Sequence, residues 1–98
     1  MDKLELFNEL IKVVTPVNSK NAHADSLDDY LVDTGLDSLD LLMMGIFLSD
    51  IYGVPEEIAK QAEPKTVGEM IDYMEQHKTK EPPATAQEAV AQVSWQFI

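Results

Sequence analysis

Apolar residues recur every three or four positions in several segments of this chain, and prolines separate those segments. Such spacing is typical of a helix with one apolar face, and the residue before a proline is pushed out of helical geometry. The first segment carries its apolar residues at Leu4, Phe7, Leu10, Ile11 and Val14. No segment shows a convincing strand pattern, so we predict an all-α protein.

Three further helices are predicted. One covers residues 37–52, because Gly53 and the proline after it end the apolar pattern. A short helix is expected over 55–62, and a longer one over 66–77 begins with the capping-box sequence Thr-Val-Gly-Glu. Residues 18–35 have no sustained periodicity and are expected to form a long loop. The prediction is a four-helix bundle with three longer helices, one short helix and a long loop between the first and second helices.

The helical spacing of apolar residues stops after residue 78. We expect one domain over residues 1–78, followed by a linker and a C-terminal tail over residues 79–98. The tail contains a second capping-box sequence that starts at Thr85, and apolar residues at helical spacing follow it. It is therefore either a frayed end, as most chain ends are, or a helix that docks on the bundle or on a partner.

Charge and composition exclude several classes of function. The 98 residues include 18 acids and 7 lysines, which give a formal charge of −11. This charge argues against binding nucleic acid or an anionic membrane, and for partners with positive patches. Without cysteine the chain has no disulfide, thiol nucleophile or thiolate zinc site. The start lacks the pattern of a signal peptide, and the apolar run 41–48 is shorter than the roughly 20 residues of a membrane span, so we expect a cytoplasmic protein.

The most informative stretch is Gly35-Leu36-Asp37-Ser38-Leu39-Asp40, where the long loop meets the second predicted helix. It places the Ser38 hydroxyl at a helix N-terminus, where free amides and the helix dipole favour a phosphate group. A serine at this place can also be a simple N-cap. However, nine acids and no basic residue lie between Lys20 and Lys60, and such a field suits a site that basic enzymes visit in succession.

These residues resemble the acyl carrier proteins, and the resemblance covers roughly Lys3 to Lys78. In that family the serine of the Asp-Ser-Leu motif receives 4′-phosphopantetheine from coenzyme A through a phosphopantetheinyl transferase. The thiol of the arm then holds acyl groups as thioesters. The resemblance implies that Ser38 is the attachment site and that Asp37 helps to position magnesium and coenzyme A during loading. It also implies a carrier that is not itself an enzyme, with an apolar interior that shelters part of an acyl chain.

The resemblance also implies a docking surface for partner enzymes. These partners would be the transferase, an acyltransferase or acyl-ligase, and a ketosynthase or another biosynthetic enzyme with a basic patch, and the carrier itself would be a monomer. The expected docking residues are Leu39, Asp40, Met43, Ile46, Asp50, Val54, Glu56 and Glu57.

The second predicted helix departs from the fatty-acid carriers. Positions at which those proteins show glutamates are occupied here by Met43, Ile46 and Ser49. The run 41–48 is apolar all round, so the helix is either mostly enclosed in the bundle or exposes an apolar strip along Leu39, Met43 and Ile46. These departures favour a carrier of a specialised polyketide, lipid or fatty-acid-type pathway.

One rival function remains open from the sequence. The chain could be an unmodified acidic helical scaffold or adaptor that binds a basic protein. Other sites are not expected. The closely spaced acids lack the spacing of a calcium loop, so we predict no metal site at Asp28, Asp29, Asp33 and Asp37. His23 and His77 lack the neighbours that a catalytic base for Ser38 needs.

Overall fold

The computed structural model describes residues 2–15 and 21–94. Within these residues the chain is helical and has no strand, apart from one isolated bridge between Tyr30 and Thr66. The helices are α1 (Lys3–Val14), α2 (Ser38–Tyr52), α3 (Glu56–Ala59), α4 (Val67–Gln76) and α5 (Ala86–Ser94), with a 3₁₀ turn η1 (Leu31–Asp33) before α2. The all-α prediction is confirmed, and four of these α-helices are seven residues or longer.

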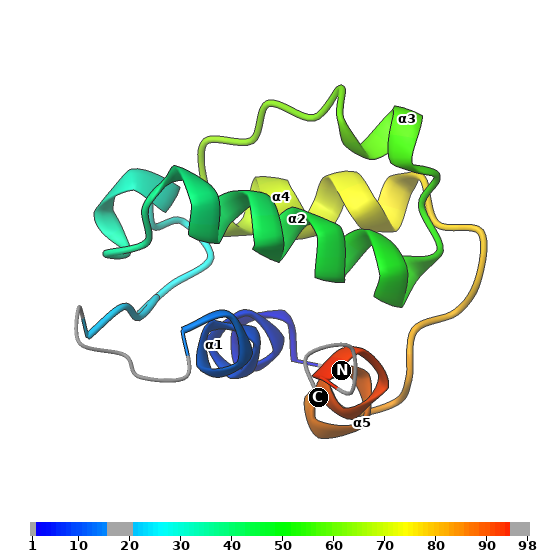
Figure 1. Ribbon diagram of the computed structural model, residues 1–98, viewed down its shortest axis with the longest axis horizontal. Helices are drawn as coiled ribbons and strands as arrows, with labels where there is room; N and C mark the ends of the chain where they lie inside the picture. Colours follow the sequence, from blue (N-terminus) through cyan, green and yellow to red (C-terminus); the bar gives the residue numbers. More distant parts are fainter. Residues whose placement is uncertain (1, 16–20, 95–98) are drawn as a thin grey trace.

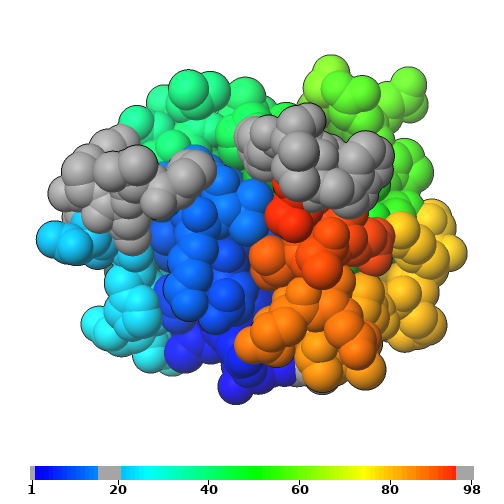
Figure 2. Space-filling model, turned by 60° about the horizontal axis from the view of Figure 1, so that its bottom comes forward, coloured from blue at the N-terminus to red at the C-terminus, as the bar shows by residue number. Residues whose placement is uncertain are grey.

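The helices are arranged around α2. In Figure 1, α2 lies across the view with α4 beside it, whereas α1 and α5 are seen nearly end-on and therefore cross α2. The α3 turn and the connection to α4 pass over the other side of α2 (Figure 1). Figure 2 shows α1 and α5 side by side on one face of the molecule. The result is a compact body with a Cα radius of gyration of 12.1 Å.

Apolar side chains from all the longer helices form the core. Its buried residues include Phe7, Ile11, Met44, Leu48, Val67, Ile71 and Met74. Phe47 and Ile51 add to it from α2, so much of that helix is enclosed. Burial of apolar surface at about 25 cal/mol per Å² is the main force that holds such a bundle together.

The long connection before α2 is fixed by specific contacts. The side-chain amide of Asn8 on α1 donates to the carbonyl of Ala24 at 2.9 Å, and its oxygen accepts the Ala24 N–H at 2.9 Å. At the other end of the connection, Leu31 donates its N–H to the Lys65 carbonyl at 2.9 Å. Leu31 is buried, whereas Tyr30 and Val32 are exposed by 56% and 80%. The segment therefore holds the start of α2 in place without enclosing it.

The tail alternative is decided in favour of a docked helix. α5 packs against α1, and Ala86, Ala89 and Val93 are buried in the same core as α1 and α2. The Thr85 hydroxyl accepts the Glu88 N–H at 3.2 Å, as the capping-box sequence predicts. The tail predicted over residues 79–98 therefore contains a helix, α5, whose buried residues belong to the same core as α1, α2 and α4. Residues 95–98 of that tail lie outside the described residues.

Lys3 joins the start of α1 to α4. Its Nζ lies 2.9 Å from a carboxylate oxygen of Asp72 and 2.9 Å from one of Glu75. The hydrogen bonds with Glu75 and Asp72 raise the pKa of Lys3 above its usual value. A raised lysine pKa stabilises the fold fully below the unfolded pKa of about 10.4, and this stabilisation is lost only as the pH rises through the folded pKa. Between pH 5 and 8 the Lys3 contribution is therefore constant.

We expect the melting temperature to rise when the net charge of −11 is screened or partly neutralised. Self-repulsion of a highly charged chain destabilises the compact state, and salt shortens the range of that repulsion. Moving from low salt at pH 7.5 to about 0.5 M NaCl, to a millimolar divalent cation or to about pH 5 should each raise the melting temperature by roughly 5 °C, which corresponds to about 1 kcal/mol. Thermal unfolding followed by circular dichroism measures this, and an unchanged curve under all three conditions contradicts it.

Candidate functional site

Ser38 is the first residue of α2 and its side chain is exposed. The chain reaches it through a turn in which Gly35 adopts a φ of 93°, a left-handed conformation that glycine adopts without a steric penalty. Leu36 is buried and anchors the turn against the core. The predicted start of the second helix is therefore confirmed, and Ser38 lies at its N-terminus with its side chain at the surface.

Two carboxylates cap α2 and leave Ser38 outside the cap. Asp37 is the N-cap residue, and its Oδ1 accepts the Asp40 N–H at 2.9 Å. In return, Oδ2 of Asp40 accepts the Asp37 N–H at 3.2 Å, which completes a capping box. The alternative in which Ser38 is the N-cap is ruled out, because Asp37 occupies that position. The Ser38 hydroxyl is therefore not needed to begin the helix.

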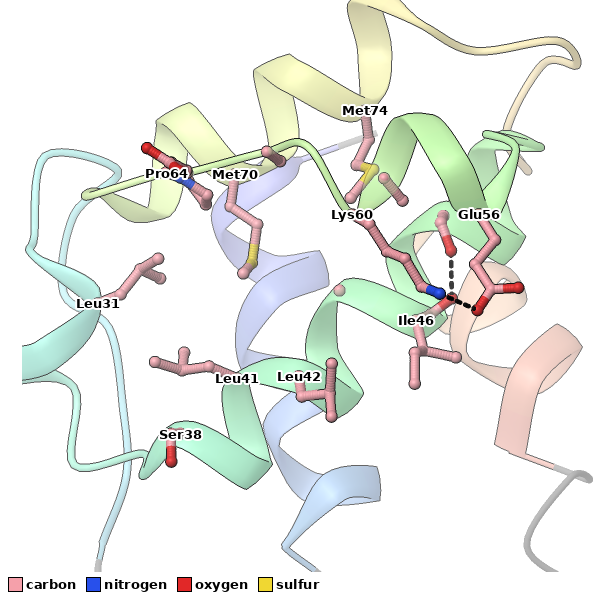
Figure 3. A pocket seen from close by; sticks show the side chains of 15 residues that line it. Leu31, Ser38, Leu41, Leu42, Ile46, Glu56, Lys60, Pro64, Met70 and Met74 are labelled. Atoms are coloured by element: carbon pink, nitrogen blue, oxygen red, sulfur yellow. Dashed lines mark hydrogen bonds and ion pairs between the residues drawn. The ribbon is translucent and has the colours of Figure 1, made fainter.

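A groove of about 720 Å³ starts beside Ser38 and runs between α2, α3 and α4. Figure 3 shows Ser38 at one end of a row formed by Leu41, Leu42 and Ile46, while Met70 and Met74 reach in from α4. Its other lining residues are Leu31, Gly45, Ser49, Glu56, Ala59, Lys60, Ala62, Glu63 and Pro64. Most of the lining is apolar, and the charged groups belong to α3 and the connection after it. The arrangement places the Ser38 hydroxyl at one end of a groove whose lining is mostly apolar.

The two interpretations of the apolar run in α2 are each correct for part of the helix. Its inner side is enclosed in the core, but Leu39, Leu42 and Ile46 remain exposed by 66%, 60% and 47%. We call these three residues the α2 strip. Met43, which was expected in the strip, is only partly exposed and packs against the core. Leu42 was missed, because Leu42 and Met43 both lie three or four residues from Leu39 and Ile46, and this spacing does not distinguish them.

The other expected docking residues are divided between the surface and the core. Asp50, Glu56 and Glu57 are exposed, and Asp40 is partly exposed because its carboxylate belongs to the cap. Val54 is only 7% exposed, so it offers little surface for contact with a partner. Its side chain packs in the core just after α2 ends. A shallow depression brings Ile46, Asp50, Val54 and Glu56 together, with Val54 buried at that place.

The described part of the chain has neither a cluster of metal-ligating side chains nor a membrane-spanning helix. Among residues 2–15 and 21–94, no group of three or more acidic or histidine side chains is placed to hold a metal ion. No helix within the same ranges has the length and apolar character needed to cross a lipid bilayer. The exposed hydroxyl of Ser38, its groove and the α2 strip are therefore the features on which a function can be argued.

Known proteins add no further constraint. The chain matches no protein-family model, no curated protein and no solved structure in the comparisons made with each.

Proposed function

We propose that this protein is an acyl carrier that bears 4′-phosphopantetheine on Ser38. The observation that carries the proposal is the exposed Ser38 hydroxyl at the start of α2, with the cap supplied by Asp37 and an apolar groove beside it. In this proposal α1 to α4 form the four-helix bundle of the carrier family and α5 is an addition to it. The protein is a cytoplasmic monomer without catalytic activity of its own.

In the loading step, the Ser38 hydroxyl is the group of this chain that forms the new bond. A phosphopantetheinyl transferase brings coenzyme A and magnesium to the start of α2. The Ser38 oxygen would attack the pantetheine-side phosphorus of the pyrophosphate, give its proton to a base of the transferase, and form a phosphodiester while 3′,5′-ADP leaves. The free amides at the start of α2 and the helix dipole favour the resulting negative charge. Asp37 precedes Ser38 and keeps its place as the cap, and it would help to position magnesium and coenzyme A during loading.

The bound arm supplies the thiol that holds an acyl group as a thioester. The residues of this chain provide shelter for that group, because Leu41, Leu42, Met70 and Met74 line the groove that starts at Ser38. Burial of a hydrocarbon chain against such a lining is favourable by roughly 0.8 kcal/mol per CH₂ group. An apolar acyl chain therefore gains from leaving water for the groove.

Partner enzymes would meet the α2 strip beside acidic side chains. Leu39, Leu42 and Ile46 offer apolar contact area, and Asp50 and Glu56 add negative charge near Ile46. An acyltransferase or acyl-ligase, and a ketosynthase or similar enzyme, would then need an apolar patch bordered by cations. Met43, Ile46 and Ser49 stand at positions where the fatty-acid carriers show glutamates, which supports a specialised polyketide, lipid or fatty-acid-type pathway.

Intact-mass spectrometry tests the proposal. The protein is incubated with coenzyme A, magnesium and a transferase of broad specificity, and the expected gain is about 340 Da, the mass of the arm. A chain that folds but gains no mass would instead be the scaffold or adaptor, a function that the exposed α2 strip also favours.

A further inference from the structure

Gly45 lies in the interior of α2, where a glycine is unfavourable relative to alanine. Among the described residues, Gly35 and Gly53 have a positive φ that explains them, and Gly45 does not. A side chain on Gly68 would come within 3.0 Å of the Leu27 carbonyl oxygen, so close packing accounts for that glycine. At Gly45, apart from its two chain neighbours and the adjoining backbone of α2, no atom of the described residues lies within 4 Å of the place that a Cβ would take. Neither the backbone nor the packing of the described chain requires glycine here.

The empty space beside Gly45 belongs to the groove. Gly45 lines it together with Leu41, Leu42 and Ile46, its neighbours on α2. Seven residues separate Gly45 from Ser38, which corresponds to about 10 Å along the helix axis. A chain that enters from the Ser38 end therefore meets Gly45 part of the way along the groove, where the wall is helix backbone without a side chain.

We infer that Gly45 determines how far an acyl chain carried on Ser38 enters the groove. This inference rests on the proposed carrier function. The chains concerned are apolar and long enough to pass Gly45, because most of the groove lining is apolar and apolar chains gain by burial there. Met70 and Met74 on the opposite side are flexible and polarizable, and they adapt to chains of different shape. Short or polar acyl groups do not reach this part of the wall.

The test compares the wild-type chain with G45A, G45L and A91L. Each protein is loaded from acyl-coenzyme A thioesters with acyl chains of two to twelve carbons, and loading is checked by intact mass. The melting temperature of each acyl form is then compared with that of the same protein bearing the unacylated arm. Ala91 is exposed on α5, outside the groove lining, so A91L adds apolar bulk without narrowing the groove.

In the wild type and in A91L, the gain in melting temperature is expected to grow with acyl length. G45A should lose part of this gain for the longer chains and G45L most of it, while two-carbon chains behave alike in all four proteins. Before loading, G45A should melt about 4–8 °C higher than the wild type, because alanine favours the helix and meets no neighbour.

Each contrary result has its own meaning. A lower melting temperature of unloaded G45A would show that glycine is needed by the fold, and the inference would fail. If the proteins are loaded and the gain is the same in G45L as in the wild type, or absent in the wild type, the inference fails and the carrier function stands. If the wild type cannot be loaded at all, the carrier function is rejected and the inference with it.

Discussion

Replacing Ser38 with alanine is expected to abolish the mass gain of about 340 Da completely and to leave the fold intact. The substitution removes the oxygen that forms the phosphodiester. It does not remove the helix cap, because Asp37 and Asp40 supply both capping hydrogen bonds. The melting temperature should therefore stay within about 3 °C of the wild type, as expected for an exposed surface substitution of up to roughly 0.5 kcal/mol.

A second serine on α2 provides the matched control. Ser49 is partly exposed, and its hydroxyl donates to the Ile46 carbonyl at 2.8 Å. Ser49→Ala should accept the arm with the full mass gain, and peptide mapping should place the arm on Ser38. Loading of Ser38→Ala to the wild-type extent would show that another side chain is modified, and the site assignment would then be wrong. Circular dichroism of both variants separates lost loading from lost structure.

Placing a charge at Ala89 is expected to have the largest effect on stability. Ala89 on α5 is completely buried in the core that this helix shares with α1 and α2. An aspartate there would carry an unpaired charge into apolar surroundings or force α5 away from the core. Either result should lower the free energy of unfolding by at least about 3 kcal/mol, which is a large part of the 5–15 kcal/mol typical of a domain.

The matched control is Ala91→Asp, which has the same net charge and the same change in helix propensity as the aspartate substitution at Ala89. Ala91 lies two residues along the same helix and is exposed, so Ala91→Asp adds the same charge to the same element. Both variants pay the lower helix propensity of aspartate relative to alanine. Beyond that shared cost, Ala91→Asp should change the free energy of unfolding by no more than about 0.5 kcal/mol. Urea unfolding measures both variants. Equal stability of the two would contradict the docking of α5.

The helix positions were accessible from the sequence because local signals specify them. Prolines and glycines end the apolar periods, and the Thr66 hydroxyl accepts the Glu69 N–H at 3.1 Å as the capping sequence predicts. The third helix was predicted over 55–62, but α3 is regular only over Glu56–Ala59. A segment this short has few hydrogen bonds of its own, so its limits depend on the packing around it.

The placement of side chains on α2 was beyond the reach of a sequence pattern. A run that is apolar all round has no polar face from which to infer its orientation, so Met43 was placed in the strip and Leu42 was missed. The structure resolves this because the helix is held between α1, α4 and α5, and this packing encloses Met44, Phe47 and Leu48. Val54 was expected at the surface but is buried, because its burial depends on contacts with distant segments of the chain.

The sequence by itself determined the helical class, the start of α2 and the candidate serine, because capping, proline breaks and helical periodicity act between residues close together in the chain. Tertiary structure alone decided that α5 belongs to the core and that a groove passes from Ser38 along the backbone of Gly45. These features depend on which side chains from distant segments fill the space between helices and which leave it open, and local patterns do not encode that space.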